Sequence, residues 1–195
     1  MQQIVAPLTV DALFFSDNAK YIYIGRAGNH VLWKRIMPLE QVLNYHQITA
    51  NIGTSGQPTR EQFERIAEQG YASVINLAMH NSDNAIPDEG SVVTALGMSY
   101  FHIPVPFDQP TAQHVKKFIH LLNALEGEKV FVHCALNARV SAFMYKYLTL
   151  CKGQTAESST SPLLRKWLPT MDAAWTSIIN LSADEVGLGK LGRQG

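Results

Sequence analysis

The residues best suited to covalent chemistry lie together in the stretch Val-His-Cys-Ala-Leu-Asn-Ala-Arg-Val-Ser at positions 132–141. Cys134 follows an apolar run typical of a buried strand, and Arg139 opens a segment with helical character. Backbone N–H groups at a helix N-terminus are unpaired and carry partial positive charge, so a thiol placed there beside an arginine ionises near neutral pH. Such a thiolate can attack phosphorus and form a phosphocysteine.

The loop between the cysteine and the arginine is expected to bind an anion. Its amides would form a nest for a tetrahedral oxyanion, which the Arg139 guanidinium would hold with two parallel hydrogen bonds. The Ser141 hydroxyl could stabilise the departing thiolate. The predicted substrate-binding residues of this segment are Ala135, Leu136, Asn137, Ala138 and Ser141.

The order strand, His-Cys, short loop, Arg and Ser, helix resembles the cysteine-dependent dual-specificity and tyrosine phosphatases. It resembles more closely the bacterial phosphatase-like domains that are also found joined to β-lactamase-fold hydrolases. The resemblance covers residues 43–152 and continues through four further segments. These are Thr54–Thr59, Val74–Leu77, Leu96–Tyr100 and His102–Val105.

The resemblance implies a cysteine-phosphatase-like α/β fold in which helices flank a central, mostly parallel sheet. It implies that Cys134 is the nucleophile and that Arg139 binds phosphate together with the loop amides. The ring of His133, also counted among the substrate-binding residues, would orient the loop. The implied substrate is a phosphomonoester on a small molecule or a protein, and the chemistry needs no cofactor.

The spacing between cysteine and arginine departs from the phosphatase pattern, which has five residues there. Cys134 and Arg139 enclose four. One alignment deletes a loop residue and keeps Arg139 as the phosphate ligand. The other keeps the register, so that Ser141 matches the family's hydroxyl and Val140 stands where the arginine belongs. Asn137 replaces a glycine of positive φ, a mild change because asparagine tolerates that region.

A phosphatase of this type also needs a general acid that protonates the leaving oxygen. The resembled family carries an aspartate on the loop after the strand that precedes the helix before the cysteine. Asp108 occupies that place, 134 − 108 = 26 residues before Cys134. Asp83 and Asp88 are rivals on another loop.

Each of these residues also has a purely structural interpretation. Cys134 could be a buried apolar cysteine with a packed histidine before it, and Arg139 could form a surface ion pair. Ser141 could bond to its own helix, and Asp108 could belong to an ordinary turn. The second cysteine, Cys151, lies among apolar residues and is interpreted as packing.

Strands alternate with helices along most of the chain, which is typical of an α/β fold with a parallel sheet. Thr59 and Gln62 form a capping box, and Thr111 precedes an apolar helical face. Pro162 and Pro169 are expected to break up the tail. The predicted strands are Tyr71–Leu77, Ser99–Val105 and Lys129–His133, and the predicted helices are 59–70, 89–96, 111–127, Ala138–Lys152 and Met171–Leu181.

Two regions are expected in the chain. Residues 39–195 form the phosphatase-like domain with C-terminal helices, and residues 1–38 form an N-terminal extension. Within the extension, Lys20–Gly25 and His30–Trp33 have strand composition and flank a turn. This pattern favours a hairpin packed on the domain.

The composition narrows the function classes. The 195 residues are 46% hydrophobic and include 16 basic and 16 acidic residues, so the formal net charge is zero. Sequence-independent nucleic-acid binding needs surplus cations, and no apolar run reaches the roughly 18 residues of a membrane span. The first residues lack a signal-peptide pattern, two cysteines make no disulfide framework, and the histidines lack metal-ligand spacing. We expect a cytoplasmic protein without a metal, and the oligomeric state stays open.

Three functions fit these observations. The preferred one is a cysteine-dependent phosphatase-like hydrolase. The second is a module that binds an anion or a phosphorylated partner but turns over little, which the short loop would favour. The third is a sulfur-handling enzyme that carries a persulfide on Cys134.

Overall fold

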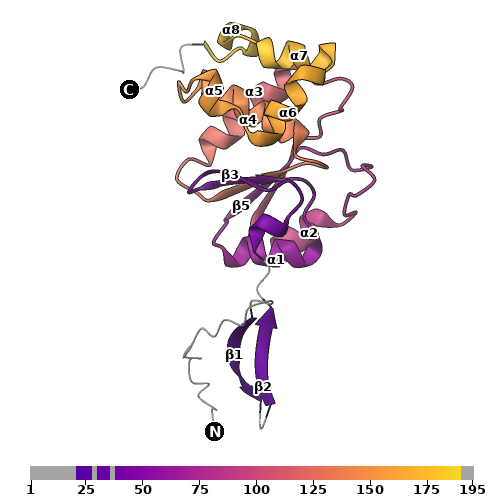
Figure 1. The fold of residues 1–195 in the computed structure, drawn as a ribbon, viewed down its shortest axis with the longest axis vertical. Helices are drawn as coiled ribbons and strands as arrows, with labels where there is room; N and C mark the ends of the chain where they lie inside the picture. Colours follow the sequence, from indigo (N-terminus) through magenta and orange to yellow (C-terminus); the bar gives the residue numbers. More distant parts are fainter. Residues whose placement is uncertain (1–20, 28–29, 36–37, 190–195) are drawn as a thin grey trace. The chain divides into compact units, whose positions relative to one another are not determined.

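Five strands form the central sheet of the structure, a computed structural model that describes residues 21–27, 30–35 and 38–189 (Figure 1). Their order across the sheet is β3-β4-β7-β5-β6. The first pair is antiparallel and all other neighbours are parallel. The strands are β3 (His46–Thr49), β4 (Ile52–Ser55), β5 (Ser73–Asn76), β6 (Ser99–His102) and β7 (Val130–His133). The predicted α/β fold with a central, mostly parallel sheet is therefore confirmed.

Helices connect these strands and make up the C-terminal part of the chain. The α-helices are α1 (Arg60–Glu68), α2 (Glu89–Ala95), α3 (Ala112–Ala124), α4 (Ala138–Leu150), α5 (Ala156–Ser159), α6 (Pro162–Trp167), α7 (Ala173–Asn180) and α8 (Ala183–Val186). Two 3₁₀ turns, Leu39–Gln41 and Leu168–Thr170, complete the described elements. None of the helices in the described ranges is long and apolar enough to cross a bilayer.

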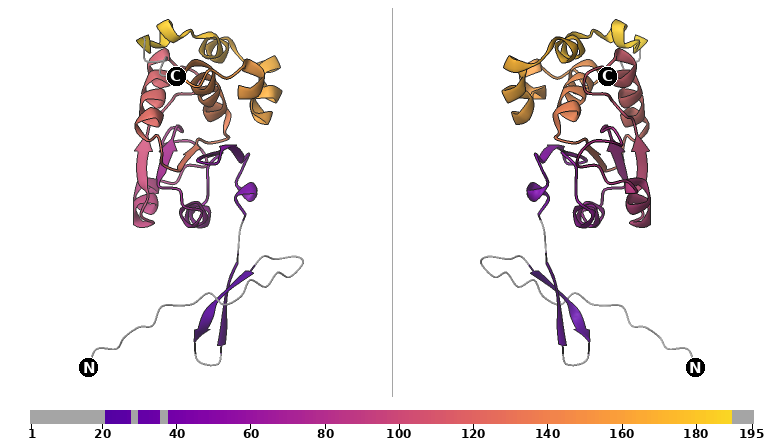
Figure 2. Two further views of the ribbon diagram at one scale, coloured as in Figure 1. Left: turned by 90° about the vertical axis from the view of Figure 1, so that its left-hand side faces the viewer. Right: turned by 90° about the vertical axis from the view of Figure 1, so that its right-hand side faces the viewer.

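The two faces of the sheet build separate cores, because successive residues of a strand point to opposite faces. Val74 and Phe131 belong to a cluster that includes residues of α1 and α2. Ile75 and Val132 belong to a larger cluster that includes residues of α3, α4 and α7. Figures 1 and 2 show the same division, with α1 and α2 on one face and α3 to α8 on the other.

The helix starts follow the chemistry expected from the sequence. Thr59 accepts a hydrogen bond from the Gln62 amide and its own amide donates to the Gln62 side chain, which completes the predicted capping box of α1. Thr111 and His114 form the same reciprocal pair at the start of α3. The apolar face of α3 is fully buried, so this helix is fixed both by its cap and by its packing.

The tail is more helical than predicted. The tail is broken into short helices, as expected, and Pro162 occupies the first turn of α6, where its missing N–H would be unpaired in any case. Ser161 caps this helix through its side chain. The last predicted helix corresponds to α7, which buries Trp175 and Ile178, and α5, α6 and α7 all pack on α4. The tail is therefore a layer over the helix that follows Cys134.

The chain divides into two units, residues 1–38 and 39–195. In the first, β1 (Tyr21–Ala27) and β2 (His30–Arg35) pair as an antiparallel two-stranded sheet. These strands lie where the sequence favours a hairpin. That the hairpin packs on the phosphatase-like unit stays a prediction, as does the assignment of the two regions as domains.

Candidate functional site

The loop between β7 and α4 carries the cysteine singled out in the sequence. Cys134 is 1% exposed, and its amide donates to the carbonyl of Ser55 at the end of β4 at 3.3 Å. Asn137 adopts the left-handed conformation, with φ 69°, immediately before α4 begins. The chain therefore turns from the strand into the helix within the four residues 134–137.

The carbonyls of this loop are held by groups outside it. The Ala135 carbonyl accepts from the Gln57 amide at 3.1 Å and from the Asn84 side chain at 3.0 Å. The Leu136 carbonyl accepts from the Asn44 side chain at 2.9 Å. Since C=O and N–H point in opposite directions in a planar trans peptide, the next two amides point to the opposite side.

The amides of residues 138–140, in the first turn of α4, find no acceptor among the described residues. Unpaired amides at a helix start and the helix dipole both favour an anion there.

Two asparagines clasp the loop to the segment before β3. The Asn137 side chain donates to the Asn44 carbonyl at 2.7 Å, while Asn44 donates to the neighbouring Leu136 carbonyl. Asn44 and Asn137 are the two non-glycine residues with positive φ in the described part of the chain. Their side chains join positions 93 residues apart in the sequence.

Gly56 lets β4 approach the loop closely. It forms an isolated bridge with Leu136, and a Cβ added to it would lie 2.9 Å from the Ala135 carbonyl oxygen. The same Cβ would lie 3.0 Å from the Leu43 side chain. A side chain at position 56 would therefore not fit, which explains the glycine of the Thr54–Thr59 segment.

Arg139 lies in the first turn of α4 and is buried, with 7% of its surface exposed. Its Nε has no hydrogen-bond partner, and the guanidinium forms no ion pair with any described residue. The guanidinium carbon lies 5.4 Å from the ring centre of Phe107. A buried cation without a counter-ion is costly, so this arrangement is suited to a bound anion.

Val140, which one alignment places at the arginine position, is fully buried in the larger core cluster. Its apolar side chain also offers no hydrogen bond to an anion. Of the two neighbouring positions, only 139 therefore carries a side chain that could bind phosphate. Arg139 lies in the same helix turn as the unpaired amides of residues 138–140.

The loop with Asp108 is anchored beside the arginine. Its Phe107 ring packs on Trp167 and Trp175, at 5.8 and 5.3 Å between ring centres. The Trp175 indole N–H donates to the Phe107 carbonyl at 2.7 Å. Asp108 itself is exposed.

The rival aspartates lie on the loop before α2. Asp83 is exposed and adjoins Asn84, which contacts the cysteine loop. Asp88 forms an exposed ion pair with Arg60, whose hydrogen bond lowers the pKa of that carboxyl. The Asp88 carboxylate is thus engaged by Arg60, whereas Asp108 and Asp83 form no ion pair with a described residue.

Ser141 is buried and accepts a hydrogen bond from the Ser161 hydroxyl at 3.2 Å. This contact joins the start of α4 to the cap of α6. Cys151 is half-buried at the end of α4, and burial raises the pKa of its thiol. Cys151 is thus less readily ionised than an ordinary thiol.

His133 is fully buried, and its Nε2 lies 3.1 Å from a carboxylate oxygen of Glu89. Glu89 is 4% exposed and also accepts hydrogen bonds from Gln57, Asn76 and Tyr100. Burial opposes its ionisation, yet the hydrogen bonds from His133, Gln57 and Tyr100 outweigh this and lower the pKa of the Glu89 carboxyl. The sequence analysis missed this residue, because nothing local separates Glu89 from an ordinary first-turn glutamate.

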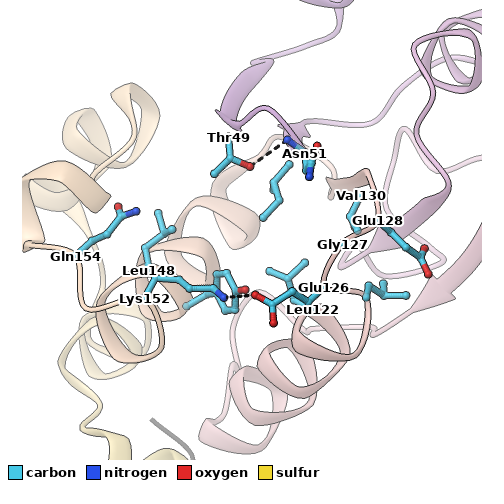
Figure 3. A pocket seen from close by; sticks show the side chains of 13 residues that line it. Thr49, Asn51, Leu122, Glu126, Gly127, Glu128, Val130, Leu148, Lys152 and Gln154 are labelled. Carbon is cyan, nitrogen blue, oxygen red and sulfur yellow. Dashed lines mark hydrogen bonds and ion pairs between the residues drawn. The ribbon is translucent and has the colours of Figure 1, made fainter. Parts of the chain in front are cut away.

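A cavity of about 290 Å³ lies at the other end of β7 (Figure 3). Val130, the first residue of the strand, lines it, whereas Cys134 follows the last. Lys152 and Glu126 form an ion pair of 2.8 Å across its wall. Its remaining lining residues are Thr49, Asn51, Ile52, Leu122, Leu125, Gly127, Glu128, Tyr147, Leu148 and Gln154. This cavity is separate from the cysteine loop.

Comparison with known proteins agrees with this geometry. A family model described as "DSP-PTPase phosphatase fused to NAD+ Kinase" matches residues 37–174. The crystal structure of a candidate phosphatase of the DUF442 group from Shewanella putrefaciens CN-32 is 31% identical, with a TM-score of 0.68. The similarity covers 80% of this chain and 97% of that one.

More distant similarity shows the same fold. The P. aeruginosa protein TpbA, crystallised in complex with pTyr, is 15% identical with a TM-score of 0.61 over 78% of this chain and 92% of TpbA. A beta-lactamase hydrolase-like protein of Xylella fastidiosa is 30% identical over 95 residues, or 47% of this chain. The match spans only 22% of the length of that relative.

Proposed function

The chain belongs to the family described as DSP-PTPase phosphatase fused to NAD+ kinase, and from this premise we propose that it hydrolyses a phosphomonoester through a phosphocysteine intermediate. The observation that carries the proposal is the buried Arg139 guanidinium in the same helix turn as the unpaired amides of residues 138–140. The guanidinium and the amides can both donate hydrogen bonds to a phosphate dianion. Cys134 is the first residue of the loop that leads to them.

In the first step, the Cys134 thiolate attacks phosphorus and the bond to the leaving oxygen breaks. The loop amides and Arg139 stabilise the non-bridging oxygens, where negative charge is concentrated. Asp108 gives its proton to the leaving oxygen, so that an alcohol or phenol departs.

In the second step, water attacks the phosphocysteine. Asp108, now ionised, takes a proton from the water, and the thiolate leaves as inorganic phosphate forms. The Ser141 hydroxyl, at the start of α4, is proposed to stabilise that thiolate. His133 is proposed to orient the loop throughout.

The test is phosphate release from para-nitrophenyl phosphate. Replacing the nucleophile in Cys134→Ser is expected to lower kcat by at least about a thousandfold, because the serine hydroxyl is a far weaker nucleophile than a thiolate. Cys151→Ser is the matched control, since it removes the other thiol and leaves the loop intact. A folded wild-type protein without turnover above buffer would refute the proposal.

A second function is favoured by the four-residue loop, which has one amide fewer than the resembled phosphatases. In that case the domain would hold a phosphorylated partner with little turnover. Phosphate or vanadate would then raise the melting temperature of Cys134→Ser as much as that of the wild type, while neither protein released phosphate.

A further inference from the structure

Glu89 connects the ends of several strands beneath the cysteine loop. One of its carboxylate oxygens accepts from Asn76 of β5 at 2.8 Å, from the Tyr100 hydroxyl of β6 at 2.9 Å and from His133 of β7 at 3.1 Å. The other oxygen accepts from Gln57, which follows β4. A single buried carboxylate thus bonds to groups on or next to all four parallel strands.

The surroundings of Glu89 require it to be an acceptor. The pKa of Tyr100 is raised, first by burial and then by the charge of Glu89, so its hydroxyl keeps its proton and donates. No lysine or arginine among the described residues pairs with Glu89, and the adjacent Asp88 faces Arg60 instead. The carboxylate is therefore stabilised by hydrogen bonds rather than by a neighbouring cation.

These contacts also determine which nitrogen of His133 carries a proton. The carboxylate accepts from Nε2, so Nε2 carries one. The Nδ1 atom is buried and has no partner among the described residues, and a proton there would be an unpaired buried donor. The His133 ring is held between Glu89, which accepts from Nε2, and an edge contact to Phe63.

We propose that Glu89 is a positioning residue of this site: it holds the His133 ring through Nε2 and thereby fixes the strand end from which the Cys134 loop begins. The inference deepens the proposed function, because it takes Cys134 as the reacting thiol. Glu89 does not touch the substrate; it acts by keeping the loop amides and Arg139 directed at the thiolate.

The test is the pH dependence of iodoacetamide alkylation of Cys134, measured by mass spectrometry in a Cys151→Ser background. Glu89→Gln keeps the size of the side chain but replaces one acceptor oxygen with an NH₂ donor, which must face either the Gln57 side chain or the three donors to the other oxygen. We expect the loop to lose its alignment and the midpoint of alkylation to rise by about one pH unit, a tenfold change in thiol ionisation. Alkylation needs no turnover, so the result stands apart from the outcome of the phosphatase assay.

If Glu89 acted only through its charge, the expected shift of the midpoint would be opposite to the shift expected from loss of its contact with His133. Removing a buried negative charge would by itself favour the thiolate and lower the midpoint. Glu89→Asp keeps the charge but withdraws the carboxylate from Nε2, and we expect it to raise the midpoint as well. An unchanged or lowered midpoint in both variants would overturn the proposal.

Two further variants separate a positioning role from a general loss of stability. Lys146 is buried to the same extent as Glu89 but donates to the Ile179 and Leu181 carbonyls in the tail. Lys146→Met is expected to lower the melting temperature without moving the midpoint. His133→Asn removes the Nε2 position, and the double variant with Glu89→Gln should shift the midpoint no further than either change alone. Additive shifts would contradict action through His133.

Discussion

The charged side chains at the two ends of β7 differ in burial and in pairing. At its carboxyl end, Arg139 is 7% exposed and has no counter-ion among the described residues. At its amino end, the side chains of Lys152 and Glu126 are paired and are 38% and 70% exposed. Only about 13 Å of strand separates the two ends.

This contrast shows where binding free energy is available. Water screens the exposed pair, so it contributes little to stability, and a ligand would gain little from replacing it. The buried cation is unfavourable until an anion arrives, so an anion that binds it relieves a cost already present in the folded chain. The cavity of about 290 Å³ lies at the end with the exposed pair, away from the proposed anion site.

Arg139→Met is expected to give the largest difference in turnover between variants at the two ends of β7. Turnover should fall by about a thousandfold, because the guanidinium stabilises the transferred phosphoryl group. In phosphate-free buffer the melting temperature should hold or rise, since an unpaired buried charge is removed. Lys152→Met, the matched cation at the other end, should change neither turnover nor the stabilisation by phosphate. Equal stabilisation of Arg139→Met and wild type by phosphate would place the anion elsewhere.

The next effect concerns the two candidate acids at the carboxyl end. Asp108→Asn is expected to lower kcat by about a hundredfold, because the leaving oxygen must then depart without a proton. The loss should shrink for leaving groups of low pKa and should remove the alkaline limb of the pH profile. Asp83→Asn should change kcat little. If instead Asp83→Asn lowers kcat and Asp108→Asn changes it little, Asp83 is the acid.

A smaller effect separates loop geometry from stability. Gly56→Ala forces a Cβ against the Ala135 carbonyl, and we expect about 1–3 kcal/mol of destabilisation together with weaker phosphate binding. Gly127→Ala, beside the other cavity, meets no atom within 4 Å but has φ +95°, so it should cost about 1 kcal/mol or more of stability and leave activity unchanged. Denaturant unfolding and phosphate titration of both variants would settle this; equal losses of phosphate affinity would contradict it.

The smallest effect is expected at the exposed pair. The hydrogen bond from Lys152 lowers the pKa of Glu126 in the folded chain, so its contribution is present above the unfolded pKa and is lost as the pH falls through the folded pKa. Because the Glu126 side chain is 70% exposed, Glu126→Gln should leave the melting temperature within error at pH 7 and in acid alike. A clear loss of stability at pH 7 would show that the amino end is not screened as the comparison assumes.

The sequence predicted those parts of the site that depend on neighbours along the chain. Cys134, Asn137 and Arg139 lie within six residues, and the strand, left-handed turn and helix start follow from local preferences. The parallel sheet followed from the alternation of strands and helices.

The remaining contacts join residues far apart in the sequence and could not be predicted. Glu89 meets His133 across 44 positions, and Asn84 meets Ala135 across 51. The helix α6, which begins at Pro162, was not predicted for a related reason, since it packs on α4, which is distant in the sequence. The short loop spacing left two registers open, and in the structure Val140 lies in the larger core cluster whereas the Arg139 guanidinium lies against Phe107.

The hydrogen bonds between Asn44 and the Cys134 loop determine how much of the chain the proposed catalytic domain needs. A fragment that started at β3 would retain the whole central sheet and all of the proposed catalytic residues. It would nevertheless lack Asn44, which supports the Leu136 carbonyl and receives the Asn137 amide. The segment around Asn44, ahead of β3, therefore supports the Cys134 loop from outside the sheet. A shortened protein that began at β3 would lose this support.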